Sequence, residues 1–289
     1  YGLMCVGLGL IFGVMRVVNF AHGDFMMLGM YIAFYIVTLT GLGTLIGPHA
    51  APIVAALLAG PIVFAIGIFL HRVLVGRVTG VKVMSSESEG HFAQIILTLG
   101  ISLFLQNAGL LTFGSLPVSV QTPLSRESWE IGPIFLNQAR TVSFVIAVVV
   151  ALALYWFLSR SITGKALRAA ADNPVAASYV GVDVDRAHRL AFGLGVGITA
   201  IGGGLIATTQ TFQPYIGFDF VIVMFAGVVL GGLGSILGSF WGGLTIGLVQ
   251  QLATLVLPHQ LQNTAIFVVF LLIIFFWPRG MFGRVWERT

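Results

Sequence analysis

Charged residues are scarce in this sequence. Only 8% of its 289 residues are Asp, Glu, Lys or Arg, whereas 57% are hydrophobic. A soluble globular protein carries about 25% charged residues. Because so little charge cannot cover a soluble protein of this size, we expect lipid to cover much of the surface. The composition therefore excludes an ordinary soluble domain and predicts an integral membrane protein.

Cysteine is nearly absent as well. Cys5 is the single cysteine of the sequence. One cysteine excludes an internal disulfide and a cysteine-rich metal site. The apolar runs also contain no nucleophile–base pair and no set of ligands spaced for a metal ion. We therefore predict that the chain is not an enzyme and binds no metal or cofactor itself.

The few basic residues follow a pattern. The 14 Lys and Arg outnumber the 10 Asp and Glu and lie mostly in short segments between apolar runs. They form no basic face with interleaved aromatic residues, so we predict no nucleic-acid partner. Lys and Arg are enriched in cytoplasmic loops of membrane proteins. We therefore assign residues 71–82, 159–189 and the tail from 279 to the cytoplasm, and the segment 114–139 to the external side.

Long apolar runs divide the rest of the chain. A membrane-spanning helix needs about 20 mostly apolar residues. One run, 220–257, is too long for a single helix, and we expect its glycines near 231–235 to split it into a short helix and a full one. The fold class that follows is all-α: a polytopic transmembrane bundle of about eight segments, some broken or short, in a single domain over 1–289. The runs are 1–15, 25–46, 52–75, 92–113, 141–158, 190–209, 220–257 and 265–277.

The first run opens at Tyr1 without an initiator Met, and we interpret it as the tail of a first helix with further residues ahead of it. Counting crossings from the cytoplasmic segments makes this helix run inward and the second one outward. The motif Gly9-Leu10-Ile11 with Asp24-Phe25 is matched at the same offset by Gly204-Leu205-Ile206 with Asp219-Phe220. Because these copies run in opposite directions, they predict an inverted repeat, as in many transporters, although chance matches in a glycine-rich sequence are the alternative.

Glycine is abundant, with 37 residues, and several glycines lie four apart. This spacing puts small residues on one helix face and lets helices approach closely. Tight packing explains the pattern, and a gating hinge at the turn around 231–234 is the second interpretation. The candidate hinge or packing residues are Gly23, Gly231, Gly232, Gly234 and Gly238.

A polar segment, 16–24, interrupts the first two runs. Polar side chains and irregular backbone at membrane depth are tolerated only where they face protein or a water-filled cavity. One interpretation is a translocation path; the other is a turn in which Asn19 and Asp24 cap the next helix. Polar residues in other runs can instead form interhelical hydrogen bonds. The candidate path residues are Asn19, His22, Asp24, Gln94 and Gln210.

The most charged stretch contains two short helices. Residues 164–172 are rich in alanine and predict one helix, Asn173 breaks it, and Pro174 suits the first turn of a second helix that ends near Gly181. Such a pair between membrane spans is either a rigid projection that enters a groove on a soluble partner or a helix pair lying on the membrane surface. The residues alone leave both open.

Three segments resemble a known family. Residues 13–29 resemble the signature of the LivH-type permease subunit of branched-chain amino acid ABC importers, with Met30 where Ala is usual. Residues 164–181 resemble its coupling segment. The glycines of 231–243 resemble its C-terminal pattern, which related sugar permeases share. The resemblance extends over nearly the whole chain.

The resemblance implies a working arrangement in the bacterial inner (plasma) membrane. A second homologous permease would complete the pore, two cytoplasmic ATPase subunits would bind ATP and Mg, and an external substrate-binding protein would deliver the substrate. The implied substrates are Leu, Ile and Val, whereas close relatives carry urea, short amides or aromatic acids. The coupling segment, 160–189, would meet the ATPases. Its implied coupling residues are Gly164, Lys165, Leu167, Arg168, Ala169, Asn173, Pro174 and Gly181.

A stand-alone channel or secondary carrier is the alternative from another class. A proton-driven carrier usually needs an ionisable relay within its spans. The apolar runs hold no paired acidic and basic residues, and the predicted helix pair at 164–181 speaks against such a protein. These features favour the ATP-driven importer.

Overall fold

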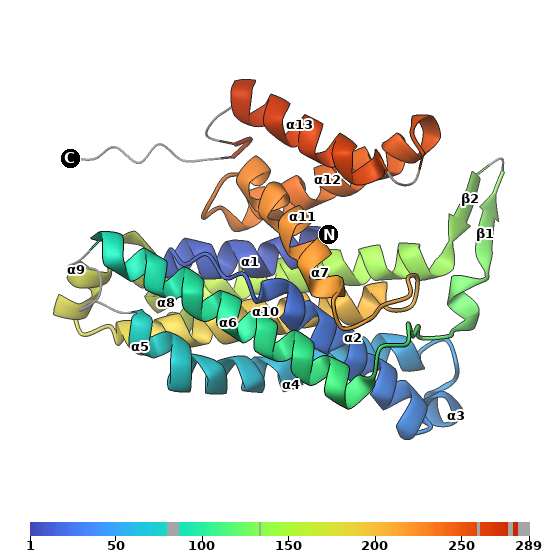
Figure 1. Ribbon diagram of the computed structural model, residues 1–289, viewed down its shortest axis with the longest axis horizontal. Coiled ribbons are helices and arrows are strands. Elements are labelled where there is room, and N and C mark those ends of the chain that lie inside the picture. Colours follow the sequence, from blue (N-terminus) through green and yellow to red (C-terminus); the bar gives the residue numbers. More distant parts are fainter. Residues whose placement is uncertain (80–86, 133, 259–260, 277–279, 283–289) are drawn as a thin grey trace.

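The computed structural model describes residues 1–79, 87–132, 134–258, 261–276 and 280–282. In this part of the chain, six helices are long and apolar enough to cross a membrane, and three shorter apolar helices accompany them. Most helices lie along one long axis, as Figure 1 shows. The arrangement confirms the predicted polytopic helical bundle.

The first half of the bundle follows the predicted runs closely, except in the second run. The third run continues beyond α4 through a π-helical turn, η1, and α6 begins five residues before the predicted start of the fourth run. The elements are α1 (Gly2–Met15), α2 (His22–Leu39), α3 (Leu42–Ile46), α4 (Ala51–Leu70), η1 (His71–Val75), α5 (Gly76–Val78) and α6 (Glu87–Phe113).

The second half contains the core helix. The split of the long run at residues 231–235 is confirmed, since α11 and α12 flank it. The elements are the turn η2 (Pro123–Ser125), the strands β1 (Ser128–Ile131) and β2 (Ile134–Asn137), and the helices α7 (Gln138–Arg160), α8 (Ile162–Asp172), α9 (Pro174–Tyr179), α10 (Val184–Ile206), α11 (Ile216–Gly231), α12 (Ile236–Val256) and α13 (Gln262–Phe276).

Helix α10 forms the centre of the bundle, packed against α1, α2 and α4. Glycines at these contacts bring backbone against backbone. A Cβ at Gly7 in α1 would collide with the Gly195 carbonyl oxygen, and one at Gly202 would touch Met4. Since higher numbers in α1 meet lower numbers in α10, the two helices are antiparallel. This close approach is the packing role expected for small residues at helix interfaces.

Helices α2 and α11 both begin partway along the bundle (Figure 1). They are antiparallel as well, because Phe20 packs on Phe225, with ring centroids 5.6 Å apart, and Tyr31 on Phe212, at 5.0 Å. Between these contacts a Cβ at Gly23 would fall on the Gly217 carbonyl oxygen. The two copies of the internal echo therefore lie side by side in opposite directions, as an inverted repeat requires.

The glycines of the α11–α12 turn fill two roles. Gly231 and Gly238 pack backbone to backbone, and a Cβ on either would enter the other's carbonyl group. Gly232 and Gly234 adopt φ angles of 102° and 86°, a region that favours glycine. Packing and turn geometry thus account for these four residues, and a gating motion stays a prediction.

Some predicted boundaries were wrong, and one element was not predicted. The second run was expected to be helical over 25–46, but α2 ends at Leu39 and Gly41, with a φ of 61°, separates it from α3. The external segment 114–139 contains a hairpin in which Trp129 pairs with Leu136, and α7 begins within it. Polarity alternates in β1 but not in β2, so the sequence gives only a weak signal for this hairpin. Residues 80–82 of the first segment assigned to the cytoplasm, and 279 and 283–289 of the tail, lie outside the described residues.

Candidate functional site

Helices α8 and α9 form a small projection at the end of the bundle to the left in Figure 1. Side chains set its corners: Ser161 Oγ accepts a hydrogen bond from Gly164 N (2.9 Å), Asn173 Oδ1 from Ala176 N (3.0 Å) and Asp183 Oδ1 from Arg186 N (2.9 Å). These are helix N-caps, each of which typically contributes about 1 kcal/mol. The two short helices predicted from the sequence are therefore confirmed, with starts fixed by local chemistry.

The predicted coupling residues divide into an inner and an outer set. Gly164, Leu167 and Pro174 are buried and dock the projection onto the bundle, and Ala169 is half-buried. Gly181 is exposed, and its φ of 86° makes the turn into α10. The outer set that a partner can reach is Lys165, Arg168, Asn173 and Gly181.

Exposed apolar side chains share the surface of the projection. Ile162 is 87% exposed, Tyr179 85% and Val180 78%, and Val175 is also exposed. Together with Lys165 and Arg168 we call these residues the projection face. The sequence interpretation emphasised small alanine surfaces and missed these apolar residues, although their positions at helix ends next to Ser161 and Gly181 were a usable signal. Exposed apolar groups rimmed by charge are typical of protein interaction sites.

The projection is tied to the polar segment before α2. Arg16 Nη2 donates to the Ala171 carbonyl oxygen at 3.5 Å, and Arg168 Nη2 donates to the Ser159 carbonyl oxygen at 3.3 Å. Arg16 itself adopts a left-handed φ of 54° where α1 ends. The contact of Arg16 therefore links α8 to the segment that leads into α2.

A buried polar cluster lies at the start of α2. The Asp24 carboxylate accepts hydrogen bonds from Ser102 Oγ (2.5 Å) and Gln106 Nε2 (3.0 Å), both on α6. Ser102 lies midway along the apolar part of α6, Phe92–Phe113, so the cluster sits at mid-depth of the spans. Asp24 thus does not cap α2, the alternative considered for it, but fastens α6 to α2.

His22 and Asn19 complete this cluster on the side of α10. His22 Nε2 lies 2.7 Å from Thr199 Oγ1, and Asn19 Oδ1 accepts from Ala21 N at 3.1 Å. His22 Nδ1 and Asn19 Nδ2 are buried without a hydrogen-bond partner in the described part of the chain. Asn19, His22 and Asp24 are each at most 1% exposed, so here they face protein, and their place on a translocation path stays a prediction.

The two glutamines predicted on the path lie apart from this cluster. Gln94 Nε2 donates to the Val78 carbonyl oxygen at 3.2 Å, which links α6 to α5. Gln210 follows α10 and lines a cavity of about 400 Å³ between α1, α7, α10 and α12. The described residues therefore do not bring the five candidate path residues to one place.

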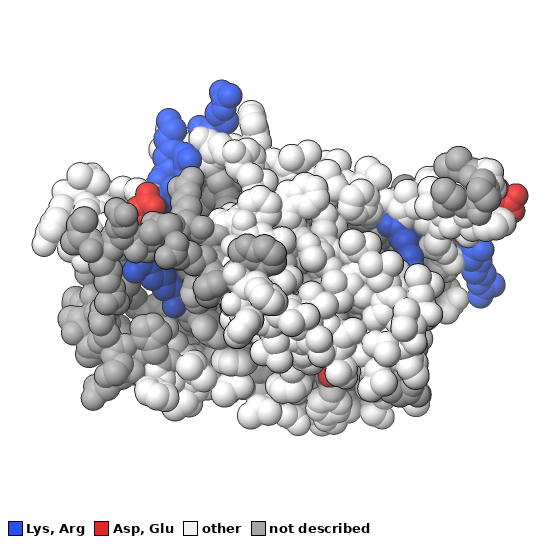
Figure 2. All heavy atoms as spheres, turned by 90° about the horizontal axis from the view of Figure 1, so that it is seen from above, with Lys and Arg blue, Asp and Glu red and all other residues white. Residues whose placement is uncertain are grey.

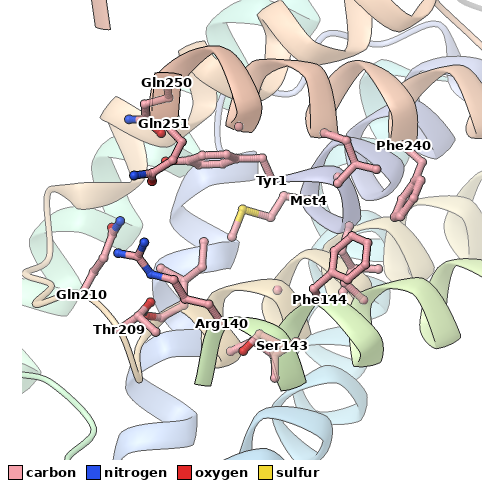
Figure 3. A pocket seen from close by; sticks show the side chains of 18 residues that line it. Tyr1, Met4, Arg140, Ser143, Phe144, Thr209, Gln210, Phe240, Gln250 and Gln251 are labelled. Atoms are coloured by element: carbon pink, nitrogen blue, oxygen red, sulfur yellow. The ribbon is translucent and has the colours of Figure 1, made fainter. Parts of the chain in front are cut away.

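Figure 3 shows this cavity with its polar groups gathered at one end, around Gln210 and Arg140, and with Met4, Phe144 and Phe240 farther along. A second hollow of about 290 Å³ shares Arg140 and Gln210 with it. Tyr1 lines the cavity, and α1 is antiparallel to α10 and α12. Residues ahead of Tyr1 in a longer chain would follow this space, so it fits an extension of the first helix as well as a ligand.

Basic residues gather toward the ends of the molecule. Figure 2 shows the Lys and Arg side chains at the two ends of the long axis and almost none between them. This is the distribution of a protein whose middle lies in lipid. In the described residues no group of three or more His, Cys, Asp or Glu could hold a metal ion.

The comparisons with known proteins agree with this architecture. The family model described as branched-chain amino acid transport system, permease component, matches residues 1–276. The chain is 31% identical over 295 residues to the high-affinity branched-chain amino acid transport system permease protein LivH of Escherichia coli (strain K12), over 98% of this chain and 91% of that protein. It is 30% identical over 292 residues to the corresponding protein BraD of Pseudomonas aeruginosa, over 98% and 92%. No solved structure matches the chain significantly.

Proposed function

The chain belongs to the family of branched-chain amino acid transport system permease components, and from this premise we propose that it forms half of the pore of an ATP-driven importer. It is a multi-pass membrane protein and acts as a transport permease. We propose the inner membrane as its location, because these relatives are bacterial transport permeases, and the branched-chain amino acids Leu, Ile and Val as its substrates, because the relatives' names state branched-chain amino acid transport.

The partners we propose are a second homologous permease, two cytoplasmic ATPase subunits that bind ATP and Mg, and an external binding protein. The observation that carries this proposal is the projection face. Ile162, Tyr179 and Val180 are apolar and almost fully exposed at an end rich in Lys and Arg, where the positive-inside rule places the cytoplasm. A soluble ATPase is the partner that buries such a face.

Coupling then follows from the contacts of the projection. When the ATPases close, they displace α8 and α9 as one unit, because Asn173 ends α8 and also caps the start of α9. The motion passes through Arg16 to the segment ahead of α2 and alters how α2 and α6 meet at Asp24. The pore changes from one opening to the other through this displacement.

The first experiment reconstitutes the complete complex in proteoliposomes with the binding protein outside and ATP inside. We expect leucine accumulation that requires ATP, and none with this chain alone. Uptake by the isolated chain would contradict the proposal and support the stand-alone carrier. Competition by isoleucine and valine, but not by urea, an amide or phenylalanine, identifies the substrate class.

The second experiment tests the projection face. We expect Tyr179→Asp to remove the ATPases from the purified complex, since it puts a charge into an apolar contact. Phe135→Asp changes an equally apolar, exposed residue of the hairpin at the other end and serves as the control. Full retention of the ATPases by the Tyr179 variant would exclude α9 from the contact.

A further inference from the structure

The outer face of α11 carries an exposed carboxylate. Asp219 lies in the first turn of α11 and is exposed. Its carboxylate accepts no hydrogen bond and forms no ion pair with any residue that the structure describes. A carboxylate within the hydrocarbon is costly, so such a group faces water or protein.

Neighbouring residues fix the depth of Asp219. Gly217, two residues earlier, packs against Gly23 and Asp24. Asp24 in turn binds Ser102, midway along the apolar part of α6. Asp219 therefore lies near the middle of the spans and not in an interfacial region, where an exposed carboxylate would be ordinary.

The internal repeat pairs Asp219 with Asp24. The dipeptides Asp24-Phe25 and Asp219-Phe220 occupy the first turns of two antiparallel helices, α2 and α11. Two donors from α6 satisfy Asp24. The equivalent position beside Asp219 is occupied by no helix in the described part of this chain. The two halves thus place an aspartate at the same position. Asp24 has hydrogen-bond donors from α6, whereas Asp219 has no such donor among the described residues.

Apolar side chains surround Asp219 on the same helix face. Tyr215, Phe218 and Ile222 are spaced for one side of a helix and are all exposed. We call these three residues and Asp219 the α11 face. One negative charge beside rings and an aliphatic chain complements a zwitterionic amino acid with a branched side chain.

We propose that the α11 face lines the translocation path and that Asp219 binds the ammonium group of the amino acid in transit. This assignment rests on the proposed function as an amino acid importer. An ammonium group brings three donors and a positive charge to a carboxylate that has neither among the residues that the structure describes. The side chain of Leu, Ile or Val then packs against Phe218 and Ile222.

The uptake test uses the complete reconstituted complex. Asp219→Asn keeps the size and removes the charge, whereas Asp219→Glu keeps the charge. We expect the Asn variant to lose leucine uptake by about tenfold or more, the effect of one lost charge-assisted contact, and the Glu variant to recover part of it. Glu127→Gln, in the external segment, serves as the control. Undiminished uptake by the Asn variant overturns the proposal.

The same variants separate a ligand site from a subunit contact. We expect Asp219→Asn to retain the second permease, the ATPases and ATP hydrolysis without substrate. Loss of the second permease from this variant would assign the carboxylate to an ion pair between subunits and overturn the proposal. If the unaltered complex takes up no amino acid at all, the proposed function itself fails, which is a distinguishable result.

Labelling with a water-soluble thiol reagent tests the path without transport. Cys5 is fully buried, so the unaltered chain gives little background. We expect Phe218→Cys in the assembled complex to react and leucine to slow the reaction. Val149→Cys, exposed on α7, is the lipid-facing control and stays unlabelled. An unreactive Phe218→Cys would place the α11 face against lipid or protein and overturn the proposal.

Discussion

Single residues in this protein matter most where backbone touches backbone or where a polar atom is enclosed. Asp24 illustrates both cases. Its backbone packs closely against Gly217, and its carboxylate accepts hydrogen bonds from two α6 side chains. The sequence identified Asp24 and His22 as polar residues at membrane depth. It could not identify their partners, because Ser102, Gln106 and Thr199 lie far along the chain and look like ordinary polar residues within apolar runs. Which residues touch one another depends on tertiary packing that no local pattern records.

Gly23→Ala is expected to destabilise the protein. A Cβ there would fall on the Gly217 carbonyl oxygen, which cannot move without shifting α11. Overpacking of this kind costs about 1–3 kcal/mol. Thermal unfolding of the purified chain in detergent measures the effect. Gly100→Ala is the matched control, because nothing lies within 4 Å of a Cβ at that position. Equal melting temperatures for the two variants would contradict the packing described here.

Removing a hydrogen-bond donor to the Asp24 carboxylate is expected to lower the stability of the fold, because this carboxylate is buried. Gln106→Leu leaves the carboxylate with a single side-chain donor, and an unsatisfied buried group costs about 1–3 kcal/mol, more when it is charged. In the double variant with Asp24→Leu the loss should be smaller than the sum of the two single losses. A double-mutant cycle on thermal or denaturant unfolding gives the coupling, and strict additivity would argue against the hydrogen bond.

At the scale of the elements, helices with long apolar runs were predicted well and the connections between them were not. The helix pair α8–α9 could be predicted because Asn173 is a typical helix N-cap and Pro174 a typical first residue of a helix. The break at Gly41 and the β-hairpin around Gly132 escaped prediction, since apolar composition masks a turn in one case and short strands carry little signal in the other. The sequence predicted helix α11. That its exposed face lies at mid-depth of the spans follows only from the packing of Gly217 against α2.

Arg168→Ala and Gly181→Ala are expected to impair ATP-coupled uptake while the protein remains in the membrane. The first removes the hydrogen bond to the Ser159 carbonyl that joins α8 to α7. The second places a side chain at a φ of 86°, which costs about 1–2 kcal/mol. Leucine uptake and membrane content are measured together in proteoliposomes. Gly43→Ala, at an open position without a positive φ, is the control, and normal uptake by both variants would refute the coupling role of α8–α9.

For the whole molecule, the distribution of basic residues predicts the orientation in the membrane. Lys165→Cys should react with a membrane-impermeant thiol reagent only from the cytoplasmic side, and Glu127→Cys only from the external side. Both residues are exposed, and they lie on opposite sides of α7 in the chain. Labelling intact cells and inverted vesicles compares the two directions. The reverse pattern would overturn the assignment of the projection to the cytoplasm and, with it, the proposed contact with the ATPases.

The glycine contacts around α10 restrict how the molecule can change shape. Where α10 meets α1, α2 and α4, at Gly195, Gly203 and Gly197, carbonyl groups lie where side chains would normally separate two helices. Helices in such close backbone contact cannot slide along each other without steric clashes. We therefore expect α1, α2, α4 and α10 to move as one rigid unit. Helix α6 is held to that unit by the hydrogen bonds of Ser102 and Gln106 to Asp24, so we expect a change of conformation to occur at this contact and not between the four helices.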